Sequence, residues 1–327
     1  MLGKIYKVCI VGVGQLGSRH LQSLAKVDLP LKIYAVDPSL ESLKVAESRF
    51  LEIESVNFKE ACFLTETDSV PMELDLVIVA TNSMNRKDII NNLLGSREVN
   101  CLLLEKFLFP RISDYKHISE LLQKKQVKTF VNCPRRAFEF YKKIATGINS
   151  IVNFSVSGSN WMLGCNSIHF LDLFAKLSGV NSVEFINEEL DEEIIPSKRA
   201  GYIEFTGTIQ LRSSRGDVFS ATSYKSGTHP VIVKIDCADQ YWVINERDKT
   251  YQYSSEINNW VVETGAFEIP NQSKIGTAII EDILKNGDCD LTPYDVSANL
   301  HLILLSTYMD KYKRSLAVES IDLCPIT

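Results

Sequence analysis

The chain lacks any pair of cysteines at metal-binding or redox spacing, although eight of its 327 residues are cysteine. Scattered cysteines without a CxxC pair indicate neither a zinc site nor a disulfide framework. We therefore expect reduced thiols and no bound metal. Reduced thiols are typical of the cytoplasm, which is where we expect this protein.

Long apolar runs and basic residues are also scarce. No run approaches the length of a membrane helix, and the N-terminus lacks the apolar stretch and cleavage signal of an exported protein. The 35 Lys and Arg residues against 41 Asp and Glu give a formal net charge of -6. These absences argue against a membrane or a nucleic acid as partner.

The composition is otherwise that of a globular protein, with 45% hydrophobic and 23% charged residues. A chain of 327 residues is too long for one ordinary core, so two domains are expected. We place the first domain at residues 1–133 and the second at residues 134–327.

A strand that enters a glycine-rich turn is the most informative feature present. Residues 8–11 form a buried apolar strand, and Gly12, Gly14 and Gly17 follow it in GxGxxG spacing. The first glycine permits the tight turn, the second lets the backbone approach a pyrophosphate, and the third lets the next helix pack closely. A helix that opens at Gln15 directs its free N–H groups at the phosphates. The expected phosphate-binding residues are therefore Gly12, Gly14, Gln15, Leu16 and Gly17.

An acidic residue stands where this motif places its ribose-binding group. An apolar strand over residues 33–36 delivers Asp37 about 20 residues past the last glycine. A carboxylate there binds the ribose 2′-hydroxyl and repels a 2′-phosphate, so we expect NAD rather than NADP. Similar turns occur in folds that bind methyl donors or no ligand, but the order of strand, glycines, helix and acid favours the dinucleotide.

Strands and helices alternate up to Cys133. We expect strands over 76–81, 101–105 and 129–133, and helices over 40–50, 85–94 and 113–125. This order predicts an α/β Rossmann domain with a doubly wound parallel sheet. Ligands bind beyond the carboxyl ends of such strands, so Gly12, Thr81, Lys106 and Cys133 are expected at one cleft.

The pattern changes after Arg136. Helices are expected over 138–148, 166–177, 274–285 and 294–311, and strands over 152–157, 202–211, 218–224, 231–237 and 241–245. Strands with little helix between them predict an α+β domain with an open, mostly antiparallel sheet. The acidic stretch 187–193 is expected to be a solvated turn rather than a binding surface. The apolar run 231–235 indicates burial against another subunit, and hence a homodimer or a higher homo-oligomer.

Four stretches resemble motifs of the glucose-fructose oxidoreductase, inositol dehydrogenase and rhizopine-catabolism (GFO/IDH/MocA) family. They are Val11 to His20, Val79 to Asn82, Leu104 to Lys106 and Ile168 to Asp172. The resemblance covers nearly the whole chain. It implies a Rossmann domain that binds NAD or NADP, and an open sheet domain that covers a sugar site and commonly forms the subunit interface. It also implies hydride exchange between nicotinamide and a hydroxyl or keto carbon of a sugar or cyclitol.

The resemblance adds Thr81, Asn82, Glu105 and Lys106 to the expected cofactor contacts. Lys106 also suits catalysis, because hydride transfer from a secondary alcohol requires a base for the hydroxyl proton and the reverse reaction requires an acid. A lysine can in addition donate a hydrogen bond to a developing alkoxide. The alternative for Lys106 is a solvated lysine at the end of a strand.

His169 is the second expected catalytic residue, and this role is implied by the resemblance. Taken alone, His169 would be a hydrogen-bonded core histidine, and a substrate-binding role is also open. Asp172 shares its helix face, so the carboxylate can orient the ring or merely pair with it. Arg136 matches a frequent substrate-side arginine, with a surface arginine that caps a helix as the alternative.

Three further residues complete the expected substrate site. Trp161 can stack on a sugar face or fill the core, and the core is favoured. Cys165 and Asn166 precede His169 in a run that is similar to relatives acting in surface-polysaccharide sugar biosynthesis.

The chain departs from the family pattern at three positions. Phe107 follows Lys106 where proline is frequent, Arg86 stands in place of the usual histidine, and Cys165 replaces a common aspartate. Two function classes therefore stay open: an NAD-dependent sugar oxidoreductase, and a catalytically inactive NAD-sensing regulatory or scaffold protein. Retention of Lys106 and His169 favours the enzyme.

Overall fold

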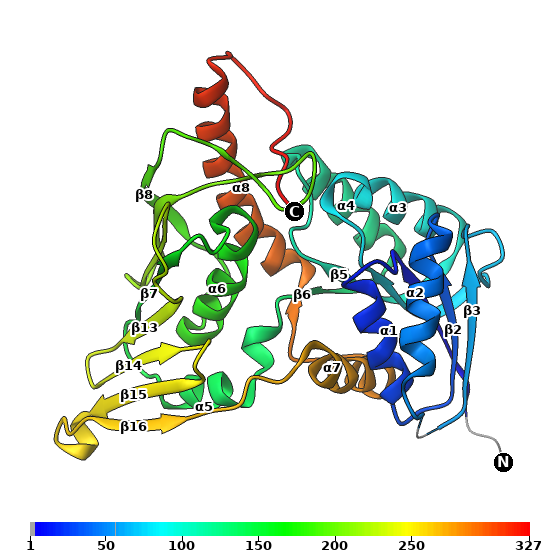
Figure 1. Ribbon diagram of the computed structural model, residues 1–327, viewed down its shortest axis with the longest axis horizontal. Helices are drawn as coiled ribbons and strands as arrows, with labels where there is room; N and C mark the ends of the chain where they lie inside the picture. Colours follow the sequence, from blue (N-terminus) through cyan, green and yellow to red (C-terminus); the bar gives the residue numbers. More distant parts are fainter. Residues whose placement is uncertain (1–3, 56) are drawn as a thin grey trace. The chain divides into compact units, whose positions relative to one another are not determined.

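A computed structural model describes residues 4–55 and 57–327 of the chain. The chain folds into two compact units, whose elements are labelled in Figure 1. Unit 1 contains the chain up to Phe109, then Ser113–Pro134 and Pro270–Tyr294. Unit 2 contains Pro110–Ile112, Arg135–Ile269 and Asp295–Thr327. Residues 270–294 therefore return late in the sequence to the unit that the N-terminus begins.

The sheet of unit 1 has the strand order β17-β6-β5-β4-β1-β2-β3 among the described residues. Its strands are β1 (Tyr6–Val11), β2 (Leu31–Val36), β3 (Lys59–Leu64), β4 (Glu73–Val79), β5 (Glu98–Glu105), β6 (Lys128–Asn132) and β17 (Thr292–Pro293). All neighbours pair in parallel except β17 with β6. The connection order reverses at β1, and doubly wound sheets bind ligands at such a switch point. The predicted Rossmann sheet is confirmed.

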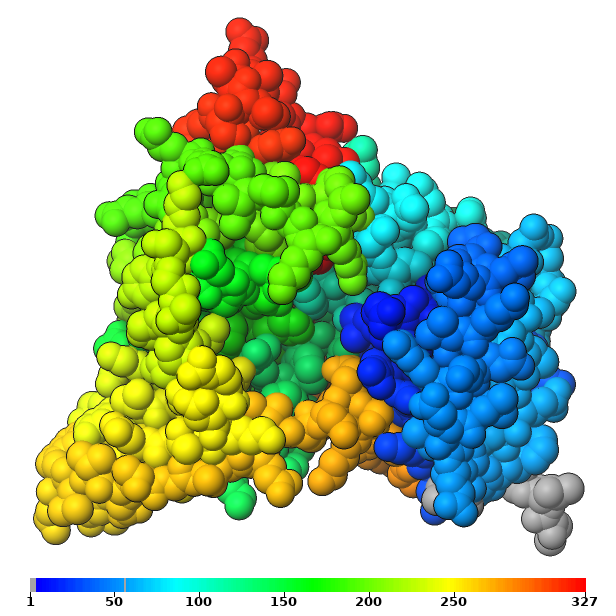
Figure 2. Space-filling view, viewed as in Figure 1, coloured from blue at the N-terminus to red at the C-terminus, as the bar shows by residue number. Residues whose placement is uncertain are grey.

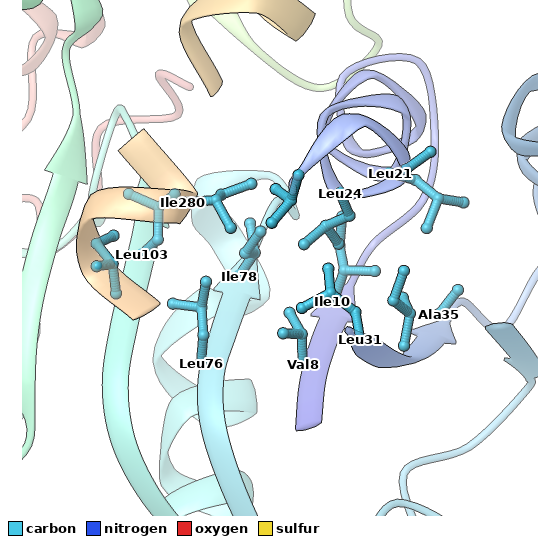
Figure 3. Packing of buried hydrophobic residues seen from close by; sticks show 14 of the residues in the cluster. Val8, Ile10, Leu21, Leu24, Leu31, Ala35, Leu76, Ile78, Leu103 and Ile280 are labelled. Atoms are coloured by element: carbon cyan, nitrogen blue, oxygen red, sulfur yellow. The ribbon is translucent and has the colours of Figure 1, made fainter. Parts of the chain in front are cut away.

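Buried aliphatic side chains fix three helices on one face of this sheet. These helices are α1 (Gly17–Lys26), α2 (Leu40–Leu51) and α7 (Gln272–Asn286). Ile10 and Ile78 from the strands pack with Ile280 from α7 in one buried cluster, as Figure 3 shows. A Cβ atom at Gly276 would lie 2.5 Å from Ser23 Oγ, so α7 packs directly on α1. The other helices of unit 1 are α3 (Ser83–Ser96) and α4 (Ile112–Lys125).

Unit 2 is built on a second sheet, with the order β16-β15-β14-β13-β7-β12-β11-β8 among the described residues. Its strands are β7 (Asn153–Ser159), β8 (Glu184–Leu190), β11 (Gly207–Arg212), β12 (Val218–Tyr224), β13 (Ile232–Asp236), β14 (Gln240–Asn245), β15 (Thr250–Ser255) and β16 (Glu263–Ala266). Only the β7–β12 pair in this sheet is parallel in the described part of the chain. The prediction of an open, mostly antiparallel sheet is confirmed.

The remaining elements of unit 2 are helical or short. They are the short 3-10 helices η1 (Pro134–Ala137) and η2 (Glu256–Asn258), the helices α5 (Glu139–Gly147), α6 (Leu163–Ser178) and α8 (Tyr294–Leu316), and the two-stranded pair β9 (Ile195–Pro196) and β10 (Ile203–Glu204). The β15–β16 hairpin lies at the surface of this unit, yellow to orange in Figure 2. No helix in the described residues has the length and apolar character needed to span a bilayer.

The two faces of the second sheet differ in chemistry. Phe154 on β7 stacks on Phe219 of β12 and packs against Phe174 of α6, which makes this face the core of unit 2. Val233 and Ile235 are fully buried. The sequence predicted that the apolar run containing them is buried against another subunit, whereas alternate residues of the strand point into the core of their own unit.

Several predicted elements agree with the structure to within a few residues, and others were missed. The strand predicted over 218–224 is β12. The predicted turn at 187–193 is wrong in its first part, because Asn187 to Leu190 lie in β8 and pair with β11. The α1 helix begins at Gly17 rather than Gln15, because Gln15 and Leu16 form a turn before it.

Candidate active site

The glycine loop of unit 1 has a separate structural reason for each glycine. Gly12 has φ of +85°, a conformation that side chains with a Cβ rarely adopt. A Cβ atom at Gly17 would lie 1.8 Å from the Gly12 carbonyl oxygen, so only glycine lets α1 approach the loop. A Cβ atom at Gly14 would meet no atom within 4 Å. The loop therefore has open space next to Gly14, where a ligand's phosphate can approach the backbone.

The loop leads into the N-terminal end of α1. The Ser18 N–H donates to the Gly14 carbonyl at 2.9 Å, which is the hydrogen-bond spacing of an α-helix. No acidic side chain lies in the first turn of α1. The free N–H groups and the positive dipole end at this position favour an anionic group.

Asp37 lies at the end of β2 and is tied to this loop. One carboxylate oxygen accepts a hydrogen bond from Val13 N at 2.9 Å, and the other accepts from Ser39 N at 2.9 Å. Ser39 in turn caps α2 by accepting from Ser42 N at 3.2 Å. These bonds hold the half-buried carboxylate beside the glycine loop, as the sequence pattern requires for a ribose-binding acid.

Two polar side chains after β4 bury atoms without a partner. Thr81 Oγ1 and Asn82 Oδ1 are buried and make no hydrogen bond within the described structure. Buried polar atoms are normally satisfied, so unpaired ones at the carboxyl end of a parallel strand mark a place for ligand atoms. Together with the open space at Gly14 and the carboxylate of Asp37, they fit the predicted NAD.

Glu105 ends β5 and is buried in a hydrogen-bond network. Its Oε1 lies 2.6 Å from His20 Nε2 and accepts from Asn132 Nδ2 at 2.6 Å. Burial raises the pKa of this carboxyl, but the hydrogen bond and charge of His20, the Asn132 bond and the charge of Arg86 outweigh burial and lower it. Lys106 follows at the strand end and is half-buried, and the peptide bond between Lys106 and Phe107 is cis.

A cavity of about 640 Å³ lies within unit 2. It lies at the ends of neighbouring strands and at the start of α6. Strand β7 ends there at Ser159, and β13 begins there at Ile232, which pairs with Asn245 at the end of β14. Its lining comprises Arg135, Ser159, Asn160, Trp161, Asn166, His169, Phe170, Thr228, His229, Pro230, Val231, Glu246, Arg247 and Ile269. Amides, hydroxyls, rings and both signs of charge therefore face one space.

An ion pair lies in the wall of this cavity. Arg135 donates from Nε to Glu246 Oε1 at 3.0 Å and from Nη2 to Oε2 at 2.8 Å. The Tyr141 hydroxyl donates to Glu246 Oε1 at 2.8 Å, and the Arg135 guanidinium lies 4.2 Å from the centre of the Phe170 ring. A bidentate pair with these supports holds both charged groups in fixed positions.

Residues 6–133 match the GFO/IDH/MocA model, described as an oxidoreductase family with an NAD-binding Rossmann fold. This part of the chain has the NAD-binding domain that the family model describes. The predicted resemblance is confirmed, as is NAD as the cofactor of the matched fold.

Solved structures of low sequence identity share the fold of nearly the whole chain. An oxidoreductase from Agrobacterium radiobacter in complex with NAD+, L-tartaric acid and magnesium is 14% identical, with 94% of this chain and 97% of that chain covered and a TM-score of 0.71. The UDP-N-acetylglucosamine 3-dehydrogenase from Acidithiobacillus ferrooxidans is 15% identical, with 97% and 99% covered and a TM-score of 0.66. A Gfo/Idh/MocA family oxidoreductase from Vibrio cholerae is 14% identical, with 95% and 99% covered and a TM-score of 0.68. No curated protein sequence matches the chain.

The predicted substrate residues fall into two groups. Trp161, Asn166 and His169 line the cavity of unit 2. Trp161 is 7% exposed and donates from Nε1 to the Thr222 carbonyl at 2.8 Å, so most of its ring belongs to the core. Asn166 donates from Nδ2 to the Trp161 carbonyl at 2.8 Å, which fixes its amide at the cavity wall.

The other predicted substrate residues do not contribute to the lining. Arg136 pairs with the fully buried Asp172, Nη1 to Oδ1, at 3.3 Å. Cys165 is half-buried, and its backbone N–H donates to Glu204 Oε2 at 3.2 Å.

Four charged or ionisable lining residues were missed by the sequence reasoning, and they are Arg135, His229, Glu246 and Arg247. Arg135 is adjacent to the predicted Arg136, but the spacing alone does not tell which of two neighbouring arginines faces the cavity. His229, Glu246 and Arg247 lie on connections between strands, where the sequence has no periodicity to place them.

Proposed function

We propose that the protein is an NAD-dependent oxidoreductase that transfers a hydride between nicotinamide and a hydroxyl or keto carbon of a sugar or sugar derivative. Two observations together carry this proposal. There is open space next to Gly14, and the buried Thr81 Oγ1 and Asn82 Oδ1 atoms make no hydrogen bond in the described structure. Membership of residues 6–133 in an oxidoreductase family supports the reaction class. In this proposal residues 1–133 bind the cofactor, and residues 134–327 bind substrate and form the oligomer.

The lining of the unit 2 cavity supports a polyhydroxylated substrate. Asn160, Asn166 and Thr228 offer amide and hydroxyl groups, while Trp161 and Phe170 offer apolar ring surface. Sugars present both hydroxyls and apolar C–H faces, so such a mixture suits them. The similar structures include a dehydrogenase named for a nucleotide-linked sugar, which fits a role in surface-polysaccharide sugar biosynthesis.

Lys106 is the proposed acid and base. NAD supplies the hydride acceptor or donor when bound. Lys106 follows the buried Glu105 at the carboxyl end of β5, the edge where doubly wound sheets bind their ligands. From there its neutral amine would take up the hydroxyl proton of the substrate during oxidation, and its ammonium would return a proton to the carbonyl oxygen during reduction. The N–H groups can also donate a hydrogen bond to an alkoxide. Glu105 stays bonded to His20 of α1 and Asn132 of β6, so its carboxylate holds these two elements and is not assigned to the proton transfer.

His169 is proposed as the second catalytic residue, since it lines the cavity of unit 2. Arg136 and Asp172 support it as a buried pair, with Asp172 one helical turn further along α6. Cys165 keeps a packing role in this proposal.

The experiment that tests the proposed function begins with bound and added ligands. Purified protein is denatured, and released dinucleotide or sugar is identified by mass spectrometry; NAD+ is also titrated into the native protein by calorimetry. Gly14→Val is the matched variant, because a Cβ atom at this position would meet no protein atom within 4 Å and the branched side chain would extend into the proposed phosphate space. We expect NAD+ binding by the wild type and its loss in Gly14→Val. Equal binding by both proteins would contradict the proposed site.

The second candidate is an NAD-sensing regulatory or scaffold protein without catalysis. It is favoured by one observation, which is Cys165 in place of the family's common aspartate. Binding of NAD+ without any change of NAD absorbance on addition of sugars, cyclitols or sugar nucleotides would favour this candidate over the enzyme.

The proposed assembly is a homodimer or a higher homo-oligomer. The outer face of the unit 2 sheet carries small polar residues such as Ser155, Ser220 and Thr222, which alternate with the buried residues of the same strands. These small side chains lie between Gln210 of β11 and Lys234 of β13 on the same face, and the face of one sheet can pack on that of a second copy.

A further inference from the structure

Arg86 lies in the first turn of α3, and its long side chain is fully buried. The guanidinium donates to three backbone carbonyl groups, those of Thr81, Phe107 and Leu108. The distance from Nη1 to the Leu108 oxygen is 2.8 Å. These contacts lie within unit 1, at the edge of the sheet where the candidate cofactor residues gather.

The three carbonyl groups belong to two different connections. Thr81 lies between β4 and α3, while Phe107 and Leu108 lie between β5 and α4, directly after Lys106. A planar guanidinium presents its donors in a fixed fork, so three bonds from one side chain fix the two backbone segments relative to each other. The backbone that carries Lys106 is thereby tied to the turn that carries Thr81.

The charge of Arg86 matters as well as its length. Burying a cation is costly, and an apolar side chain could fill the same space without that cost. The guanidinium instead supplies charge-assisted hydrogen bonds, which are stronger than neutral ones. Its positive charge also favours the ionised form of Glu105, the residue before Lys106.

We propose that Arg86 is a positioning residue that fixes Lys106 by clamping the β5–α4 connection to the β4–α3 connection. The catalytic use of Lys106 rests on the proposed function, whereas the clamp itself does not. Loss of the clamp leaves the β5–α4 connection free to move relative to Thr81, and the Lys106 side chain then samples the environment of an exposed lysine.

The chain offers a matched control at Arg97. This arginine also donates to backbone carbonyl groups, with Nε to Val70 at 3.1 Å and Nη2 to Thr67 at 2.8 Å. Its partners precede β4, so they lie toward the opposite ends of the strands from Lys106. Both arginines hold backbone segments of unit 1 in place, but of these two arginines it is Arg86 that contacts the connection after Lys106.

The test labels lysines by reductive methylation with 13C-formaldehyde and follows the dimethyl-lysine signals by NMR. Lys106→Arg identifies the Lys106 signal by its disappearance. In Arg86→Gln, we expect the Lys106 signal to move to the position of exposed lysines and to sharpen. In Arg97→Gln, we expect it to stay at the wild-type position. Arg86→Lys keeps the charge but loses the fork, so its signal should lie between the two.

An unchanged Lys106 signal in folded Arg86→Gln, or an equal change in Arg97→Gln, would overturn the proposal. Circular dichroism reports whether each variant is folded. If Arg86→Gln does not fold, Arg86→Lys decides: movement of the signal supports the clamp, and a wild-type signal overturns it. NAD+ added to the labelled wild type tests the proposed function separately. If the position of the Lys106 signal does not change when NAD+ is added, the proposed nicotinamide site is contradicted. The result for Arg86 does not depend on this outcome.

Discussion

Asp37 accepts a hydrogen bond from the backbone N–H of Val13 at 2.9 Å, and this bond joins the acid at the end of β2 to the glycine loop after β1. The carboxylate is therefore oriented by the same loop that is open to a phosphate at Gly14. We expect a carboxylate held in this way to face the ribose of a bound dinucleotide.

This geometry predicts the cofactor preference. NAD(H) should bind at least tenfold more tightly than NADP(H), a difference of about 1.4 kcal/mol, because Asp37 repels a 2′-phosphate. Asp37→Ser should narrow the preference, and Asp37→Arg should narrow it further or reverse it. Calorimetric titration of each protein with both cofactors measures the effect. Equal affinities of the wild type for the two cofactors would show the prediction to be wrong.

Removal of the lysine amine should affect catalysis and not cofactor binding. Lys106→Ala is expected to lower kcat by about 10²–10⁴-fold, the usual contribution of a positioned acid or base. The Kd for NAD+ should hardly change, since the glycine loop and Asp37 are intact. The value of kcat is measured from the change in NADH absorbance. The substrate is the sugar that mass spectrometry identifies after release from the denatured protein. Lys124→Ala, at an exposed position of α4, is the control and should retain wild-type kcat.

The glycine loop could be predicted because the reasons for its glycines are local in the sequence. Gly12 needs its positive φ, and Gly17 needs its missing Cβ, for reasons that lie within a few residues of each. The buried parallel strands were predictable for a similar reason, because strands such as β4 are almost continuously apolar. The edge strand β8 was missed because six of its seven residues are exposed or half-buried and four of them are charged or polar, so its pattern does not alternate.

The cavity of unit 2 could not be predicted in the same way. Arg135 and Glu246 are 111 residues apart, and they meet because β14 takes its place in the sheet through long-range register. His229 reaches the cavity through the connection between β12 and β13. Such contacts depend on the pairing of distant strands, which hydrophobic periodicity does not specify residue by residue.

The free energy of unfolding of unit 1 should decrease at low pH because of Glu105. The pKa of this carboxyl is below its ordinary value of 4.5 in the folded protein. A lowered folded-state pKa contributes stability above the unfolded pKa, and that contribution is lost as the pH falls through the folded pKa. We therefore expect the urea midpoint of the wild type to decrease as the pH is lowered below about 4.5. This decrease should be steeper than that of Glu105→Gln.

At neutral pH, Glu105→Gln should be less stable than the wild type, because the buried His20 loses a charged partner. Glu54→Gln, at an exposed position, is the control and should follow the wild-type curve. A Glu105→Gln protein with the same acid dependence as the wild type would show that another group carries it.

The outer face of the unit 2 sheet predicts self-association. Light scattering at micromolar concentration should give a mass of at least twice the 36.9 kDa of one chain. Ser220→Arg places a long cation in the middle of that face, where β12 lies between β7 and β11, and should weaken the assembly. Ser96→Arg, at an exposed position of unit 1, should not. A monomeric wild type would contradict the proposed assembly.

Substitution of Cys165 tests whether this residue contributes packing or acts as a nucleophile. Its side chain is half-buried, and the bond from its backbone to Glu204 does not depend on the thiol. A neutral thiol is a weak hydrogen-bond partner, so Cys165→Ala should lower kcat by less than about tenfold. The assay is the same NADH absorbance measurement, with Lys106→Ala as the reference for lost proton transfer. A Cys165→Ala protein as inactive as Lys106→Ala would identify Cys165 as a nucleophile, and the assignment of proton transfer to Lys106 and His169 would then have to be abandoned.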